Sequence, residues 1–328
     1  MASRWELGSV VTVFGGSGFL GRHAVEALAR DGWRVRVAVR RPELAGHLQP
    51  LGEVGQIYAV QANLRFPDSV RRAVKGAEAV VNLVGIVATS GPHNFEAVHV
   101  AGARTVAKAA SEAGARSLVH VSAIGASSKS PSSYMRTKMA GETAVLEEHP
   151  QSVILRPSVV FGPEDQLFNR FAAMARFSPF VPLIGGGHTK YQPVYVGDVA
   201  AAIAAACAGK ARPNTVYELG GPEVVTFRKL LERTLEWSGR RRYCLSIPFW
   251  VAKLAAFAMA PLPNSLRPLT VDQVRLLQSD LVVSESAEGE GRTLVGFATK
   301  YPNTIVSIVP TYLERFHPRG QFVHYRLL

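Results

Sequence analysis

The sequence has little cysteine, fewer acidic than basic residues and no long apolar run. Its two cysteines, Cys207 and Cys244, lie far apart and in no metal-binding spacing. This excludes a disulfide framework and a structural zinc site, and it favours a reducing compartment. The nine histidines are scattered without ligand spacing, so we expect no metal. No apolar run reaches the roughly 18 residues of a membrane span, and the first residues resemble neither a signal nor a transit peptide, so we expect a soluble or peripheral chain.

Positive charge is in excess instead. Lys and Arg number 37 against 25 Asp and Glu, a formal net charge of +12 over 328 residues. Such a balance indicates an anionic partner: a phosphorylated cofactor, phospholipid headgroups, nucleic acid or an acidic protein surface. The basic residues are dispersed and no nucleic-acid-binding module is present, so we expect no nucleic-acid partner.

The first half of the chain alternates β-rich runs with Ala-rich helical patterns. We expect strands over residues 10–14, 34–39, 57–61, 79–84, 117–122 and 153–156, with helices between most of them. This alternation predicts an α/β fold of the Rossmann type, with a doubly wound parallel sheet. We expect a nucleotide-binding domain over residues 1–163. Residues 164–328 are expected to form a smaller, interleaved α/β region with sheet-completing elements, in which residues 284–292 form a loop.

A glycine motif follows the first expected strand. Gly15, Gly18 and Gly21 are spaced GxxGxxG, and the next helix begins around Phe19 and Leu20. Glycine permits a tight turn, a close backbone approach to a pyrophosphate and close helix packing, while the helix N-terminus favours negative charge. At this place in a βαβ unit the motif predicts a dinucleotide site.

The end of the second expected strand bears on the choice of dinucleotide. Arg40 and Arg41 stand where NAD-binding proteins usually place an acidic residue. Guanidinium groups suit a 2′-phosphate, so NADPH is favoured, although the two arginines are also compatible with a solvated loop. Two further pairs, Asn63-Leu64 and Val84-Gly85, are candidates to contact the adenosine and are equally explained as turns at strand ends.

A second group of residues has the spacing of acid/base chemistry. Ser122 ends the fifth expected strand, and Tyr134 and Lys138 lie one helical turn apart on the next helix. We expect the ammonium to lower the pKa of the phenol, which makes Tyr134 an acid/base near neutral pH. Ser122 is expected to hydrogen-bond the reacting oxygen.

These residues resemble the short-chain dehydrogenase/reductase superfamily in its extended or atypical branch. The resemblance includes residues 15–21, Ser122, Tyr134 with Lys138, and the segments 155–163, 192–199 and 217–222. It implies that Ser122, Tyr134 and Lys138 form the catalytic set and that Pro157 lines the nicotinamide pocket.

Further segments, among them 14–22, 38–42, 60–65, 82–86 and 309–316, resemble one subgroup. This subgroup contains the bacterial relatives of the nucleotide-binding accessory subunit of respiratory complex I (alpha subcomplex subunit nine). The resemblance implies a structural NADPH and a peripheral position on the cytoplasmic face of the bacterial inner membrane (matrix side if mitochondrial). It also implies contact with complex I subunits of the peripheral arm and membrane junction, near the quinone site. The alternatives are a soluble NADP-dependent reductase or epimerase acting on a small carbonyl or nucleotide-sugar substrate, and an NADPH-sensing regulator.

The C-terminal third combines positive charge with apolar residues. Three arginines at 240–242 precede an apolar helical pattern over 247–260. This combination suits an anionic phospholipid surface, a core helix or a partner interface. The tail from His317 to Leu328 has no secondary-structure signal and is expected to extend.

Overall fold

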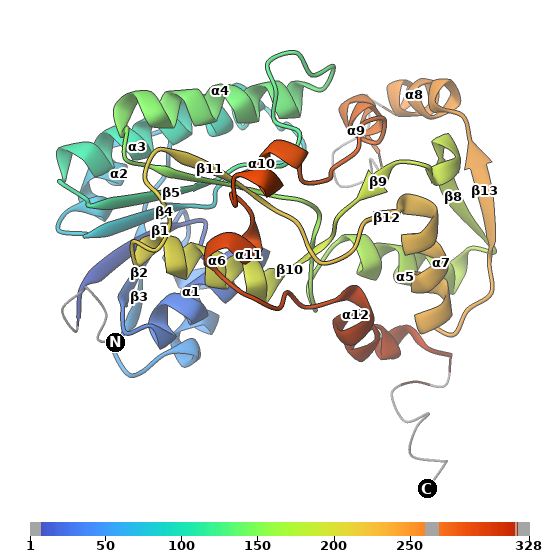
Figure 1. Cartoon of the computed structure of the whole chain (residues 1–328), viewed down its shortest axis with the longest axis horizontal. Helices are drawn as coiled ribbons and strands as arrows, with labels where there is room; N and C mark the ends of the chain where they lie inside the picture. Colours follow the sequence, from blue (N-terminus) through green and yellow to red (C-terminus); the bar gives the residue numbers. More distant parts are fainter. Residues whose placement is uncertain (1–7, 260–268, 319, 321–328) are drawn as a thin grey trace, which may run out of the picture. The chain divides into compact units, whose positions relative to one another are not determined.

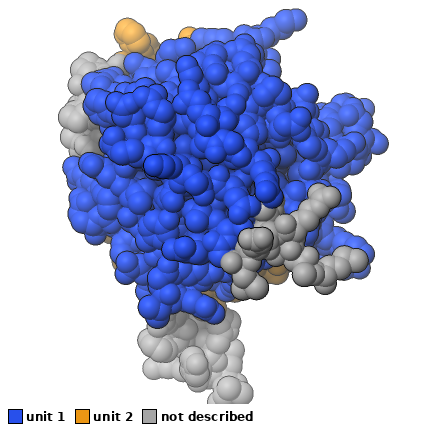
Figure 2. Space-filling model, turned by 90° about the vertical axis from the view of Figure 1, so that its left-hand side faces the viewer, with its two compact units in different colours: residues 1–157, 196–219, 283–301 blue, residues 158–195, 220–282, 302–328 orange. Residues whose placement is uncertain are grey.

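The computed structural model describes residues 8–259, 269–318 and 320, in two compact units (Figure 2). Unit 1 comprises residues 1–157, 196–219 and 283–301, and unit 2 the segments 158–195, 220–282 and 302–328. The expected division at residue 163 is a single cut, whereas the chain passes repeatedly between the two units. Most of the expected C-terminal tail, and Ala260 of the apolar segment, lie outside the described residues.

Unit 1 is built on a seven-stranded sheet in the order β11-β6-β5-β4-β1-β2-β3, with every adjacent pair parallel. The strands are β1 (Val10–Phe14), β2 (Arg34–Val39), β3 (Ile57–Gln61), β4 (Ala79–Asn82), β5 (Ser117–Val121), β6 (Val153–Pro157) and β11 (Thr215–Leu219). The strand order reverses beside β1, which creates a crevice at the carboxyl ends of the strands. The predicted Rossmann-type doubly wound fold is confirmed.

Helices cover both faces of this sheet (Figure 1). On one face lie α2 (Pro67–Val74), α3 (Gly102–Glu112) and α4 (Ser133–Glu148), and on the other α1 (Phe19–Arg30) packs on α6 (Val196–Cys207). Because both faces are covered, all four residues of β4 are buried. This explains why the strands read as continuous apolar runs.

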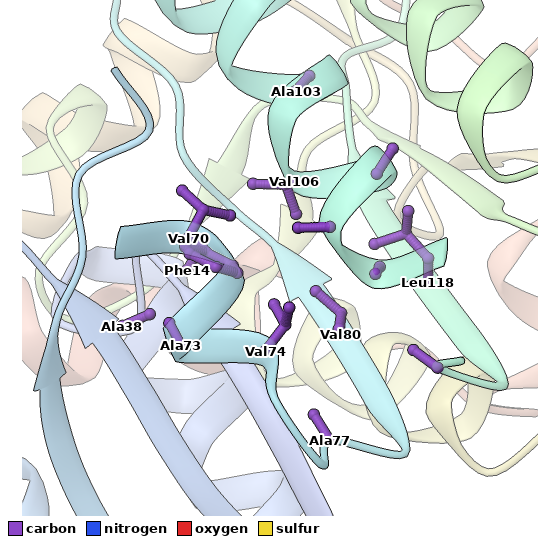
Figure 3. Close-up of a cluster of buried hydrophobic side chains, with 14 of the residues drawn as sticks. Phe14, Ala38, Val70, Ala73, Val74, Ala77, Val80, Ala103, Val106 and Leu118 are labelled. Carbon is purple, nitrogen blue, oxygen red and sulfur yellow. The ribbon is translucent and has the colours of Figure 1, made fainter. Parts of the chain in front are cut away.

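The core of unit 1 joins the sheet to α2 and α3 (Figure 3). Phe14, Val80 and Leu118 from three strands are buried against Val70 of α2 and Val106 of α3. Most of the buried residues of α3 are alanines, so the helix backbone approaches the sheet closely. Burial of each of the larger side chains, such as Phe14, Val80 and Leu118, contributes about 1.5–3 kcal/mol.

Unit 2 has a separate core, and the strands among its described residues are short. Its helices include α5 (Leu167–Phe177), α7 (Phe227–Trp237), α8 (Phe249–Ala258), α9 (Val271–Leu276) and α12 (Ile305–Leu313). Its longest strands, β8 (Phe180–Ile184) and β13 (Tyr243–Ile247), pair in parallel. The buried carboxylate of Asp165 accepts the Phe168 amide at 2.7 Å and the hydroxyl of Tyr312, which links the start of α5 to α12.

Helix α8 of unit 2 buries small residues and exposes several of its large apolar ones. Its small residues Ala252 and Ala256 are buried, while Trp250, Leu254 and Phe257 are 70%, 63% and 72% exposed. The interpretation as a simple core helix is therefore wrong for these three side chains, whereas Phe249 packs on the cluster that contains Ala252 and Ala256. Within the described ranges, no helix combines the length and the apolar character needed to cross a membrane.

Candidate functional site

A cavity of about 490 Å³ opens in unit 1 at the carboxyl ends of the sheet strands. Its walls come from the turns after β1, β2, β3 and β4 and from the segment that follows β4. This is where ligands bind in open α/β sheets, because the strand order reverses there.

The glycine turn after β1 forms one wall. Gly15 has φ +80°, and a Cβ there would come within 3.3 Å of the adjacent backbone of Leu83 and Val84. Helix α1 then begins at Phe19, and the N-cap residue Gly18 has no side chain that could cover the first amides. At Gly21, a Cβ would collide with the backbone of Gly15. The turn is thus held against the helix, with the positive end of the helix dipole behind it.

The charged groups of the cavity are of one sign. Arg40 from the end of β2 and Arg65 from the turn after β3 both line it, as does His93. Among the described residues, no Asp or Glu lines this cavity. A close backbone approach at the glycine turn and two guanidinium groups fit an elongated, phosphorylated ligand, so the residues present suit a dinucleotide.

Seven of the residues predicted to bind cofactor line this cavity: Gly15, Gly18, Arg40, Asn63, Leu64, Val84 and Gly85. Phe19, Leu20 and Gly21 lie beside it in the first turn of α1. The other predicted cofactor-binding residues do not line it: Arg41, Tyr134, Lys138 and Pro157. Ser122, which was predicted as a catalytic residue only, does not line it either. Arg41 precedes a 3₁₀ turn (η1, Pro42–Leu44), and Pro157 ends β6, where its carbonyl accepts the Ile124 amide at 3.0 Å.

Lys138 is buried beside the cavity rim. Its ammonium donates to the carbonyl of Val121 at 3.1 Å, and a Cβ at Gly85 would lie 3.3 Å from its Nζ. Ser122 directly follows β5, and its buried Oγ has no hydrogen-bond partner within the part of the chain that the structure describes. The Ser122 hydroxyl is thus available to a ligand, whereas the Lys138 ammonium already ties α4 to the end of β5.

The pKa expected for Tyr134 needs correction. Desolvation raises the pKa of its phenol to about 12, and it lowers the pKa of Lys138 to about 8. The ammonium lies 5.9 Å from the centre of the Tyr134 ring and is hydrogen-bonded to Val121. Exclusion of water therefore outweighs the attraction that the i, i+4 spacing predicts, and Tyr134 holds its proton.

His99 belongs to this site and was missed, because it has no ligand spacing. It lies on a π-helical turn, η3 (Glu96–Ala101), and its ring meets those of Phe95 and Tyr134 with centroids 5.3 Å away in each case. Its Nε2 accepts the Ile86 amide at 3.1 Å, and its Nδ1 pairs with Thr137 Oγ1 at 3.1 Å. Burial, reinforced by the charge of Lys138, lowers the pKa of His99 to about 3.

His120 is a second buried histidine, two residues before Ser122. Its Nδ1 lies 3.2 Å from the side-chain amide of Asn82, whose Oδ1 accepts the Val84 amide at 3.1 Å. Burial lowers its pKa to about 3. The sequence offered one indication of His120: it stands two residues before Ser122, and residues with this spacing in extended chain face the same side of a sheet.

The comparisons with known proteins agree with this geometry. Residues 11–220 match the profile of the NAD dependent epimerase/dehydratase family. The chain is 38% identical over 291 residues to "NADH dehydrogenase [ubiquinone] 1 alpha subcomplex subunit 9, mitochondrial" of Arabidopsis thaliana, covering 85% of this chain and 72% of that protein. It therefore belongs to the NAD dependent epimerase/dehydratase family, within the group that includes the alpha subcomplex subunit 9 proteins.

The chain is also similar to an enzyme and to a solved structure. The chain is 37% identical over 198 residues to the ceramide reductase of Caulobacter vibrioides, covering 60% of this chain and 61% of that protein. The crystal structure of an NADPH-dependent quinone oxidoreductase of Escherichia coli complexed with NADPH has a TM-score of 0.71 and 20% identity, covering 92% of this chain and 99% of that one. The similarity to this crystal structure supports the Rossmann-type fold of the chain.

Proposed function

We propose that this protein is an NADPH-binding accessory subunit of respiratory complex I. One observation carries the cofactor assignment: the cavity at the switch point of the sheet is lined by arginines, with Arg40 at the end of β2. The relatives named alpha subcomplex subunit 9 support the assembly.

In this function the cofactor acts as a structural ligand. The glycine turn and the N-terminus of α1 would hold the pyrophosphate, and Arg40 the 2′-phosphate. Asn63-Leu64 and Val84-Gly85 would border the adenosine, and Lys138 the inner end of the site. Bound NADPH would stabilise the folded state by roughly 4 kcal/mol at a thousandfold excess over Kd. When bound, the nicotinamide also supplies a hydride donor.

The second part of the proposal is a peripheral position on the cytoplasmic face of the bacterial inner membrane, near the quinone site. It is supported by large exposed side chains of unit 2: Phe180, Tyr243, Leu245, Trp250, Leu254 and Phe257. Arg241 is exposed two residues before Tyr243. Aromatic side chains beside cations suit the interface of an anionic phospholipid bilayer.

Cofactor binding can be tested on the purified full chain. We expect it to release NADPH in near-stoichiometric amount and to bind NADPH in preference to NADH. The charge reversal Arg40→Glu should abolish the preference, while the same reversal at Arg41, which does not line the cavity, should reduce it less. Unchanged NADPH affinity in Arg40→Glu would refute the cofactor assignment.

Membrane binding can be tested with vesicles. The chain should co-sediment with vesicles containing an anionic phospholipid and not with neutral ones. Trp250→Ser with Phe257→Ser should weaken this binding, whereas Val54→Ser, a change at an exposed apolar residue of unit 1, should not. Equal binding by both variants would contradict the assignment of α8 to the lipid surface.

A second candidate function is an NADP-dependent reductase. The Ser122, Tyr134 and Lys138 set is intact, and a relative is named ceramide reductase. With a ketone bound, Tyr134 would donate its proton to the carbonyl oxygen as the carbonyl carbon receives hydride, and Ser122 would hydrogen-bond that oxygen. Oxidation of NADPH by a ketone-containing lipid, abolished in Tyr134→Phe, would favour this function over the structural one.

A further inference from the structure

The segment after β4 borders the cavity and holds one histidine in place. Ser90 and His93 exchange backbone hydrogen bonds of 2.9 and 3.0 Å, and Gly91 between them has φ +52°. Both Ser90 and His93 line the cavity. This tight turn fixes the backbone of His93 beside the cavity that its side chain lines.

The imidazole meets Arg40 there. Arg40 Nη1 lies 3.4 Å from His93 Nε2, although the two residues come from different segments of unit 1. A guanidinium has only donors, so His93 Nε2 is the acceptor in this contact. Arg65 is the other charged residue that lines the cavity. No Asp or Glu among the described residues lines it. Glu96, three residues after His93, does not line it.

We propose that His93 and Arg40 together bind the 2′-phosphate of NADP(H), and that His93 takes up a proton from solvent when the phosphate arrives. This inference rests on the proposed function and assigns a further specificity residue to the same site. A phosphate accepts hydrogen bonds from both side chains and favours an imidazolium. NADH has a neutral ribose hydroxyl at this place, so its binding does not stabilise the imidazolium.

The test is a titration of the full chain with NADPH and with NADH by isothermal calorimetry, at about pH 6 and about pH 8. His93→Gln keeps a neutral hydrogen-bonding group, and His93→Arg supplies a fixed positive charge. The 2′-phosphate itself becomes more negative as the pH rises, and this changes the affinity for NADPH without any part of His93. The NADPH preference of the wild type is therefore divided by that of His93→Gln at each pH. NADH affinity serves as the internal control, because it should not change in either variant.

We expect the corrected NADPH preference of the wild type to be about tenfold larger at pH 6 than at pH 8. His93→Arg, corrected with the same His93→Gln profile, should keep the preference without the pH dependence. Calorimetry in buffers of different ionisation enthalpy should show extra proton uptake with NADPH in the wild type alone.

Two other outcomes would overturn the inference in distinguishable ways. If the wild type selects NADPH and His93→Gln matches it at both pH values, His93 has no part in the selection, and the cofactor assignment stands on Arg40. If the wild type binds NADH as tightly as NADPH, both the inference and the cofactor assignment fail.

Discussion

The Arg156 guanidinium faces the Glu142 carboxylate inside unit 1 and forms two parallel hydrogen bonds with it, Nε to Oε1 at 2.9 Å and Nη2 to Oε2 at 2.7 Å. The Glu142 side chain is 1% exposed and that of Arg156 is 16% exposed, so this largely buried ion pair joins β6 to α4. It supports the helix that carries Tyr134 and Lys138, and it explains why a charged residue is tolerated within β6.

Loss of one member of this pair should be costly. Arg156→Met leaves the buried Glu142 carboxylate without its partner and also removes the 3.7 Å ion pair with Glu218. The loss should be about 3–5 kcal/mol, and Arg156→Met with Glu142→Gln should recover the part that belongs to Glu142. Urea unfolding measures both variants. The exposed pair of Arg30 with Glu26 is the control, since Arg30→Met should cost about 1 kcal/mol or less. Equal losses in Arg156→Met and Arg30→Met would contradict this assignment.

Lys138 should make the ligand-free protein less stable at neutral pH. Its pKa is about 8 in the folded protein against an ordinary value of 10.5, so between these values the unfolded chain binds the proton and the folded one does not. Stability therefore rises with pH from about 8 to about 10, and below about 8 the full cost is present. Lys138→Met should stabilise the protein by about 3 kcal/mol at pH 7.

That gain should shrink as the pH rises toward 10, while the same variant loses NADPH affinity. Urea unfolding of Lys138→Met at pH 7, 8 and 9 follows the trend, with exposed Lys108→Met as control. A gain that does not depend on pH would show that packing, and not the buried charge, is responsible.

Acid should destabilise unit 1 through two of its buried histidines, His99 and His120. His99 and His120 both have a pKa of about 3 when folded against 6.5 unfolded, so below pH 6.5 the unfolded chain binds protons that the folded chain does not. Stability is therefore lost as the pH falls, by about 2 kcal/mol per histidine at pH 5. Urea midpoints at pH 7, 6 and 5 should fall less steeply in His120→Asn than in the wild type. Exposed His47→Asn should keep the wild-type slope.

The glycine turn should tolerate no side chain at Gly21. Gly21→Ala places a Cβ against the backbone of Gly15 and Gly16, so the turn must move away from the position that suits a pyrophosphate. We expect NADPH affinity to fall by at least about tenfold and stability by about 1–3 kcal/mol. At Gly46 a Cβ would meet nothing within 4 Å, so Gly46→Ala should behave as the wild type in both measurements. Full NADPH affinity in Gly21→Ala would contradict this role.

The parallel sheet was predictable because its evidence is local. Each βα unit carries its own strand run, and the glycine spacing marks the turn after β1. The pairing of β8 with β13 was not predicted, because the two strands lie far apart in the sequence and β13 has no buried residue to give it a pattern. The expected loop at 284–292 contains a short helix, α10 (Glu285–Gly289), which depends on the Ser284 cap.

The candidate site was predictable only in part. Arg40 and the glycines are visible as types at known spacings, and the structure brings them to one cavity. His93, His99 and His120 have no such spacing, because their positions depend on which turns and strands meet in the fold. The error in the Tyr134 pKa has the same origin, since burial is a tertiary property that the YxxxK spacing does not contain.

The most direct test of the complex I assignment is gentle detergent purification of the tagged protein from its native membranes. Mass spectrometry would identify the co-purified subunits and the released nucleotide. We expect complex I subunits and near-stoichiometric NADPH. Recovery of the protein alone from the soluble fraction, with freely exchanging cofactor, would contradict the accessory-subunit function and favour the reductase.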